Sequence, residues 1–239
     1  METMKQRKRS AGFRKSIVIV LFVLCIVATV KPAAVHAAAD DWGWRVSKAS
    51  YSFLTSGEKK IFDKAVNGMT GVSYRPVALL ATQVVAGTNY VFLCQGTTVT
   101  IKPVNRWYVL TVYENLAKKV SLLSIKEIRL TDIKTEKEPK TGPLAGGLQI
   151  AAVKNKPAAL TETVRKIFQT AAKTYTGCKL KPVALLGKQA AAGTNYRILC
   201  FGKKHALANL FILDINQNAK GECTVTSCKP LMLEEYVGR

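Results

Sequence analysis

Few side chains in this sequence are of the types that carry catalytic chemistry. Its 239 residues include only two histidines, His36 and His205, and no GxSxG, HExxH or glycine-rich phosphate-binding sequence. Cys200 and His205 are close in sequence, but a catalytic cysteine needs its base within hydrogen-bonding reach, which nearness along a strand end does not indicate. We therefore expect a protein that is not an enzyme and that needs no cofactor.

Five of the six cysteines lie beyond residue 37, and these are Cys94, Cys178, Cys200, Cys223 and Cys228. None belongs to a CxxC sequence, and His205 is the only histidine in the same stretch, so we expect no metal site. In an oxidising compartment the four in the C-terminal half could pair as disulfides in three ways, leaving Cys94 alone. The alternative is that the five are small buried apolar side chains, and the sequence leaves both interpretations open.

The strongest candidate for a binding function is a short apolar sequence that ends in a glycine. It consists of Gln83, Val84, Val85, Ala86 and Gly87, between two stretches typical of strands. Gly87 allows the positive φ that tight hairpin turns need, and Ala86 keeps the turn narrow. Val84 and Val85 offer rigid apolar surface, and Gln83 offers an amide. The alternative is that the valines merely end their strands and Gly87 is an ordinary turn residue.

The same sequence occurs twice in the chain. PVALLATQVVAGTNYVFLCQG begins at Pro76 and PVALLGKQAAAGTNYRILCFG begins at Pro182, 106 residues later, with 14 of 21 positions identical. Self-similarity of this kind indicates a duplicated structural unit. The second copy of the candidate site consists of Gln189, Ala190, Ala191, Ala192 and Gly193. We expect it to bind more weakly than the first, because both valines are replaced by alanines.

Each copy contains the same predicted order of helix and strands. Apolar residues recur at steps of three and four over 61–69 and again over 164–175, which predicts one amphipathic helix per copy. Thr55 and Glu58 form the pattern of a capping box before the first helix. Strands rich in β-branched and aromatic residues are predicted at 73–85, 88–96, 107–113 and 120–128, then at 180–191, 194–201, 207–215 and 222–232. We therefore expect the α+β class, with two tandem modules that each pack an antiparallel meander on one helix.

The N-terminal residues have the pattern of a secretory signal. Residues 1–37 combine a basic start, an uncharged apolar run over 17–30 and the sequence KPAAVHA. A membrane anchor is the alternative, but a span needs about 20 apolar residues. We expect a secreted, extracellular chain that does not span the membrane once residues 1–37 are removed. It would contain a module at 38–133, a charged and then Pro- and Gly-rich linker at 134–147, and a second module at 148–239.

The setting of the first candidate site resembles the cystatin family, whose members inhibit papain-like cysteine peptidases. The similarity rests on the QxVxG pattern of Gln83 to Gly87 and on the order of a glycine, a strand, a helix and hairpins. It implies that 38–133 and 148–239 are cystatin-like modules. It also implies reversible, noncovalent inhibition, in which the hairpin enters the peptidase cleft as a wedge without offering a bond for cleavage.

The resemblance also implies a contact role for Gly43, which would bend the N-terminal segment into the cleft with help from Trp44. Trp44 could equally be a core residue that covers the sheet. A Pro-Trp hairpin is the family's third contact element, and it is missing from the turns at 114–119 and 216–221. This difference keeps open a second function, that of a non-inhibitory binding or adhesion module.

Charge bears on that second function. The chain has 36 basic and 15 acidic side chains, and residues 38–239 keep 29 of the former and 14 of the latter. Such an excess attracts polyanionic surfaces or an exported acidic partner. The basic residues are scattered without interleaved aromatics, so we expect no specific nucleic-acid recognition. Binding that falls steeply with salt would indicate adhesion, whereas an apolar wedge tolerates salt.

Overall fold

The computed structural model describes residues 43–47, 54–130, 147–151, 160–204 and 207–237. The expected signal segment 1–37, most of the expected linker 134–147 and His205 lie outside these residues.

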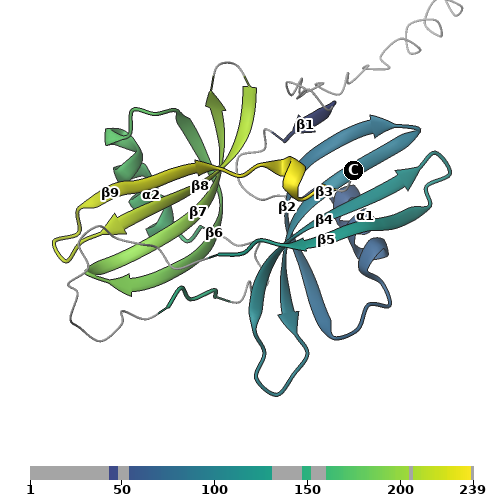
Figure 1. Cartoon of the computed structure of the whole chain (residues 1–239), viewed down its shortest axis with the longest axis horizontal. Helices are drawn as coiled ribbons and strands as arrows, with labels where there is room; N and C mark the ends of the chain where they lie inside the picture. The colour runs from purple at the N-terminus through teal and green to yellow at the C-terminus, as the bar shows by residue number, and fades with distance from the viewer. Residues whose placement is uncertain (1–42, 48–53, 131–146, 152–159, 205–206, 238–239) are drawn as a thin grey trace, which may run out of the picture. The chain divides into compact units, whose positions relative to one another are not determined.

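The described part of the chain forms two antiparallel sheets (Figure 1). In the first sheet the strands follow sequence order, namely β1 (Trp44–Val46), β2 (Val72–Val85), β3 (Gly87–Thr98), β4 (Asn105–Asn115) and β5 (Val120–Glu127). The second sheet contains β6 (Lys179–Ala191), β7 (Gly193–Lys204), β8 (Leu207–Gln217) and β9 (Cys223–Pro230), again in sequence order. All eight predicted strands are confirmed, with ends that differ by at most three residues.

The register of the two sheets confirms the duplication. The β2–β3 ladder shifts between Pro76 and Ala78, and the β6–β7 ladder shifts between Pro182 and Ala184, at the same place in each copy. A second pair of shifts also coincides. β1 has a reduced counterpart in the second copy, where Gln149 forms a single bridge with Lys188.

The described residues include three helical segments, namely α1 (Ser56–Val66), α2 (Glu162–Thr174) and the short 3-10 helix η1 (Leu233–Glu235). The predicted capping box is confirmed, because the Thr55 N–H donates to Glu58 Oε2 at 2.7 Å and the Glu58 N–H donates to Thr55 Oγ1 at 3.2 Å. Phe62 of α1 packs edge-on against Phe92 of β3. Within the described residues, no helix has the length and apolar character needed to cross a membrane.

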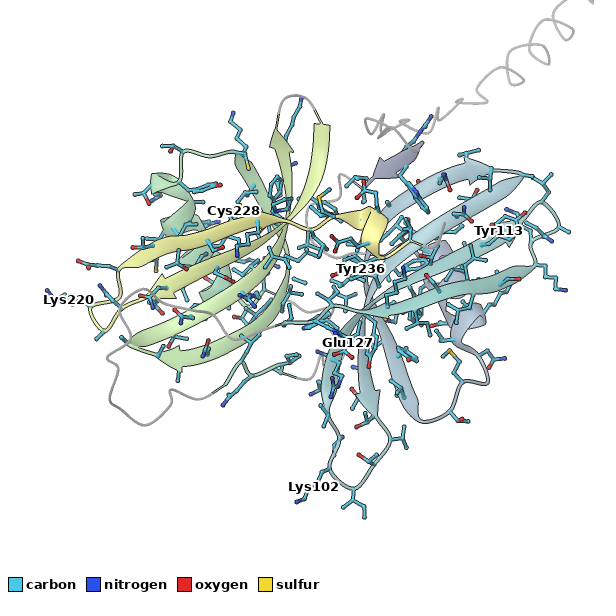
Figure 2. The ribbon with its side chains drawn as sticks, viewed as in Figure 1. Lys102, Tyr113, Glu127, Lys220, Cys228 and Tyr236 are labelled. Atoms are coloured by element: carbon cyan, nitrogen blue, oxygen red, sulfur yellow. The ribbon has the colours of Figure 1, made fainter. Side chains whose placement is uncertain are left out.

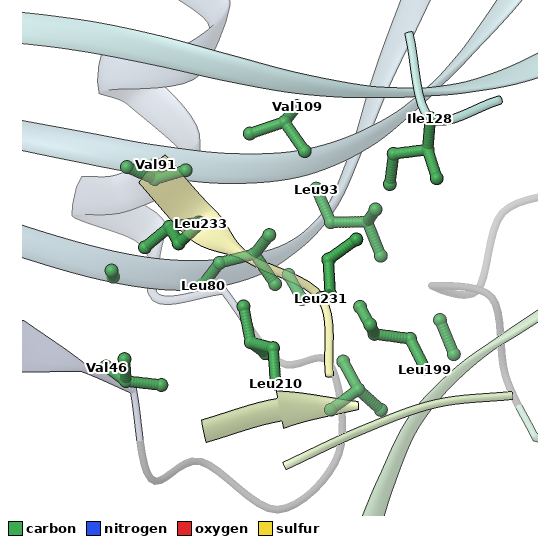
Figure 3. Packing of buried hydrophobic residues seen from close by; sticks show 14 of the residues in the cluster. Val46, Leu80, Val91, Leu93, Val109, Ile128, Leu199, Leu210, Leu231 and Leu233 are labelled. Carbon is green, nitrogen blue, oxygen red and sulfur yellow. The ribbon is translucent and has the colours of Figure 1, made fainter. Parts of the chain in front are cut away.

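The expected α+β class with two cystatin-like modules, each a sheet packed on one helix, is wrong, because the described part of the chain is mostly antiparallel β. Its helices are 11 and 13 residues long, whereas single strands reach 14 residues, and nine strands form two sheets. Side chains alternate between the two faces of a strand, so Phe92 lies toward α1 while Val91 and Leu93 lie on the opposite face. That opposite face belongs to a hydrophobic cluster to which both sheets contribute (Figure 3).

We call this cluster the shared core. It includes residues of the first sheet, residues of the second sheet and residues that follow β9, among them Leu80, Val91, Leu93, Val109, Leu199, Leu210, Leu231 and Leu233. A polar contact joins the two sheets within it, since the buried Trp107 Nε1–H donates to the carbonyl oxygen of Leu186 at 2.7 Å. The sequence pattern did not predict this core, because strand periodicity does not show what covers each face.

We expect Trp107→Phe to lower the free energy of unfolding by about 1–3 kcal/mol, since it leaves the buried Leu186 carbonyl without its donor. Urea unfolding of the two proteins would measure the difference. Tyr108→Phe is the control, because Tyr108 lies next to Trp107 but on the helix-covered face and is partly exposed. Equal losses for the two variants would show that the bond between the sheets contributes nothing of its own.

Candidate functional site

The predicted hairpin is present and has a very narrow turn. Val85 pairs with Gly87, so Ala86 is the one residue between β2 and β3. We call residues 83–87 the first tip. Gly87 has a φ of 136°, and a Cβ atom there would clash with the Glu114 carbonyl oxygen and lie 2.8 Å from Tyr113 Cε2. The Tyr113 hydroxyl donates to the carbonyl oxygen of Ala86, which fixes the turn against β4.

The two valines of the first tip lie on the surface. Val84 is 72% exposed and Val85 is 46% exposed, and Ala86 is exposed as well. Gln83 is half-buried, and its Oε1 accepts a hydrogen bond from Asn89 Nδ2 at 2.8 Å across the hairpin. The valines therefore do not belong to the protein's own core, and they form an apolar surface on a rigid support.

β1 brings the predicted N-terminal element to the same end of the sheet. Trp44 pairs with Gln83, so Gly43 lies beside the first tip, where it is exposed and has a φ of 71°. Trp44 itself is buried in the shared core. Of the two interpretations of Trp44, its position in the structure agrees with that of a core residue, whereas Gly43 remains at the surface.

The turn at 114–119, which the resemblance named as the place of the missing Pro-Trp hairpin, lies on the other side of the first tip and carries an exposed residue that was not predicted. Gly87 pairs with Asn115, so the turn between β4 and β5 neighbours Ala86. Leu116 in this turn is 82% exposed, although leucine is usually buried. The Asn115 side-chain oxygen accepts from the Lys119 N–H at 2.9 Å, which orders the turn. The available signal was a single large apolar residue in the polar turn ENLAKK.

The side chains at this sheet end are mainly apolar and amide groups. Residues 83–87 contain no titratable side chain. Burial is the main cause that raises the pKa of Tyr90 on β3, so its hydroxyl stays protonated near neutral pH. Exposed Lys118 pairs with Glu114 at 3.2 Å on the adjoining turn. The surface therefore offers apolar and amide contacts with a basic neighbour.

The second tip, residues 189–193, has the same backbone but a different surface. Ala191 pairs with Gly193, whose φ is 103° and whose missing Cβ would clash with the Gln217 carbonyl oxygen. Ala190 and Ala192 are exposed, and Gln189 is buried. Asn218 forms the turn hydrogen bonds that Asn115 forms in the first copy, so Ala219 occupies the place of Leu116. The second tip thus keeps the narrow shape but has only alanines where the first copy has valines and a leucine.

The five described cysteines are free thiols. Cys94 and Cys200 are buried, and burial raises the pKa of both thiols well above the ordinary value, so they are protonated apolar side chains. Cys178 and Cys228 lie beside Tyr175. The pKa of Tyr175 is raised, and its hydrogen bond with Cys228 is the largest cause. None of these groups lies in the two tips.

The first tip, Gly43 and Leu116 lie together at one end of the first sheet. No protein-family model, curated protein or solved structure matches this chain. Its function is therefore inferred from its own residues.

Proposed function

We propose that this chain is an exported, noncovalent inhibitor of papain-like cysteine peptidases and that the first tip is the wedge that enters the peptidase cleft. The single observation that carries the proposal is the exposure of Val84 and Val85 at a turn one residue wide. The resemblance of QVVAG to the cystatin motif supplies the class of partner. Gly43 and Leu116, on either side of the tip, would extend the contact.

The energetics of such a contact are favourable. Burying a valine or leucine side chain contributes about 1.5–3 kcal/mol, so Val84, Val85 and Leu116 together supply a substantial part of the binding energy. The backbone of the first tip is paired on both sides and bonded to Tyr113, so little conformational entropy is lost on binding. A rigid apolar wedge of this kind suits a cleft better than it suits a flat surface.

The same rigidity explains how a wedge resists cleavage. A substrate must present an extended segment to the catalytic cysteine. Val85 and Gly87 are held in ladder pairing on either side of Ala86, and the Ala86 carbonyl oxygen accepts the Tyr113 hydroxyl hydrogen. The turn would have to come apart before its peptide bonds could lie as a substrate lies.

Adhesion to a polyanionic surface is the second candidate function, and the excess of basic residues favours it. The two functions differ in their dependence on salt. Contacts through Val84 and Val85 keep their strength as salt rises, whereas lysine-based adhesion weakens when the Debye length falls to about 3 Å at 1 M salt.

We expect the double variant Val84→Ala, Val85→Ala to weaken inhibition of papain by about 100-fold. The four lost carbons correspond to about 3 kcal/mol if all are buried in the cleft. The inhibition constant is measured by titrating papain with residues 38–239 and a fluorogenic peptide substrate. Unfolding stability should not change, because both valines are exposed.

Val99→Ala, Val104→Ala is the matched control for this experiment. These valines are 70% and 47% exposed and lie at the opposite end of the first sheet. The control should inhibit papain as the unaltered chain does. An equal loss in both double variants, or no inhibition by the unaltered chain, would refute the wedge.

A further inference from the structure

The loop between β3 and β4 carries a second exposed apolar surface, separate from the first tip. Val99 is largely exposed, Val104 is about half exposed, and Ile101 is fully exposed. Lys102 marks this loop in Figure 2, and Tyr113 marks the opposite end of β4. We call residues 99–104 the apolar loop. The proposed inhibition makes no use of it.

The apolar loop is ordered by its own hydrogen bonds. The Thr98 N–H donates to the Val104 carbonyl oxygen at 3.0 Å, and the Val104 N–H donates back to Thr98 Oγ1 at 2.8 Å. The Thr100 hydroxyl donates to the Lys102 carbonyl oxygen at 2.9 Å. These bonds hold the two ends of the loop together while its aliphatic side chains remain exposed.

A neighbouring segment enlarges this surface. The Val99 N–H donates to the Gly71 carbonyl oxygen at 2.9 Å, which holds the connection between α1 and β2 against the loop. Met69 in that connection is also exposed. Methionine is flexible and adapts to irregular apolar surroundings. The exposed apolar surface therefore comes from two segments of chain rather than from one turn.

The two segments that form this surface carry only basic charged residues. Residues 67–76 and 97–106 contain Arg75, Lys102 and Arg106 and no acidic residue. Arg106 pairs with Glu127 of β5 at 2.9 Å, whereas Lys102 has no ion pair among the described residues. Each basic side chain near an anionic bilayer contributes about 1 kcal/mol of attraction. The excess of basic residues in the whole chain acts in the same direction.

We propose that the apolar loop inserts into the surface of an anionic lipid bilayer, with Ile101 as the deepest side chain and Lys102 at the headgroups. A projecting turn with aliphatic side chains can enter the boundary between headgroups and acyl chains, where interfacial segments lie about 5–10 Å deep. A soluble polyanion would make no use of three exposed aliphatic residues. The bilayer therefore satisfies both the apolar and the basic features of the loop.

Cosedimentation with phosphatidylcholine vesicles, prepared with and without phosphatidylserine, tests the proposal. The experiment uses residues 38–239, because the apolar run 17–30 would itself bind lipid, and because every described helix, strand and hydrophobic cluster lies within 43–237. We expect the unaltered protein to bind the phosphatidylserine vesicles and Ile101→Ser to bind them about 30-fold more weakly. Leu116→Ser is the matched control and should bind as the unaltered protein does, since Leu116 is also a largely exposed aliphatic residue but lies at the opposite sheet end.

A second variant measures insertion directly. The tryptophan emission of Ile101→Trp should shift to the blue when phosphatidylserine vesicles are added, by more than that of the unaltered protein. Ile101→Ser should bind heparin beads as the unaltered protein does, because a soluble polyanion makes no use of Ile101. If Ile101→Ser also binds the phosphatidylserine vesicles as tightly as the unaltered protein does, the proposal is overturned in favour of charge-driven adhesion. Equal losses in Ile101→Ser and Leu116→Ser would also overturn it. Papain inhibition should be unchanged in Ile101→Ser, so failure of this proposal and failure of the wedge are distinguishable.

Discussion

Replacing Gly87 with arginine should abolish measurable inhibition of papain by this chain, a loss of more than about 1,000-fold or 4 kcal/mol. The φ of 136° at this position is unfavourable for any residue with a Cβ, and the new atom would clash with the backbone of β4. The turn must therefore open, which displaces Val84 and Val85 and breaks the bond from Tyr113 to Ala86. The arginine would also widen a tip that has to fit a cleft.

The matched control is Gly193→Arg in the second tip, where φ is 103° and the Cβ would meet the Gln217 carbonyl oxygen. Both variants should lose about 1–3 kcal/mol of unfolding free energy, measured with urea, from comparable backbone strain. Only Gly87→Arg should lose inhibition. If the two variants gave the same inhibition curve, the first tip would not be the part of the chain that inhibits papain.

Replacing Asp214 with alanine should lower the free energy of unfolding by about 3–5 kcal/mol, the largest stability change we expect from one substitution. Arg197 of β7 and Asp214 of β8 are both buried and form a bidentate pair, with Nε–Oδ1 at 2.7 Å and Nη2–Oδ2 at 2.8 Å. Losing the carboxylate removes both of these charge-assisted hydrogen bonds from a buried guanidinium. Since folded domains are stable by about 5–15 kcal/mol, this loss is a large fraction of the total.

The first sheet supplies a matched rescue for this variant. Val91 pairs with Thr111 at the position where Arg197 pairs with Asp214. The double variant Arg197→Val, Asp214→Thr removes both charges, and replacing a buried ion pair by packed uncharged side chains is often neutral or stabilising. Urea unfolding should show that most of the stability lost in Asp214→Ala is regained. A loss below 1 kcal/mol in Asp214→Ala would contradict a role for the pair in stability.

Local elements of this protein were predictable because they depend on neighbours within a few residues. The capping box from Thr55 to Glu58 and the helix that follows it depend only on residues close by in the sequence. The hairpin at Gly87 was predictable from its glycine and the strand-like stretches on either side. The duplication supported each strand prediction, because the same pattern of apolar and polar residues occurs in both copies.

The binding surface was predictable in part. Exposure of Val84 and Val85 agrees with the hypothesis of a wedge, and strand pairing brings Gly43 to the same sheet end. Leu116 and Ile101 were missed, because the sequence shows that a turn contains an apolar residue but does not show whether another segment covers its side chain. The predicted fold class was wrong for a related reason. Strands such as β3 are apolar on both faces, and their sequence does not show whether a helix or another sheet packs on each face.

By itself, the sequence determined the duplication, the order and approximate ends of the strands, and the narrow glycine turns, since all of these follow from local conformational preferences and internal identity. Only the tertiary structure decided that the two sheets contribute to one core, that Trp44 lies inside it, and that Leu116 and Ile101 are exposed. These features depend on contacts between residues far apart in the chain, such as Trp107 and Leu186, and no local pattern encodes which distant surface will cover a given side chain.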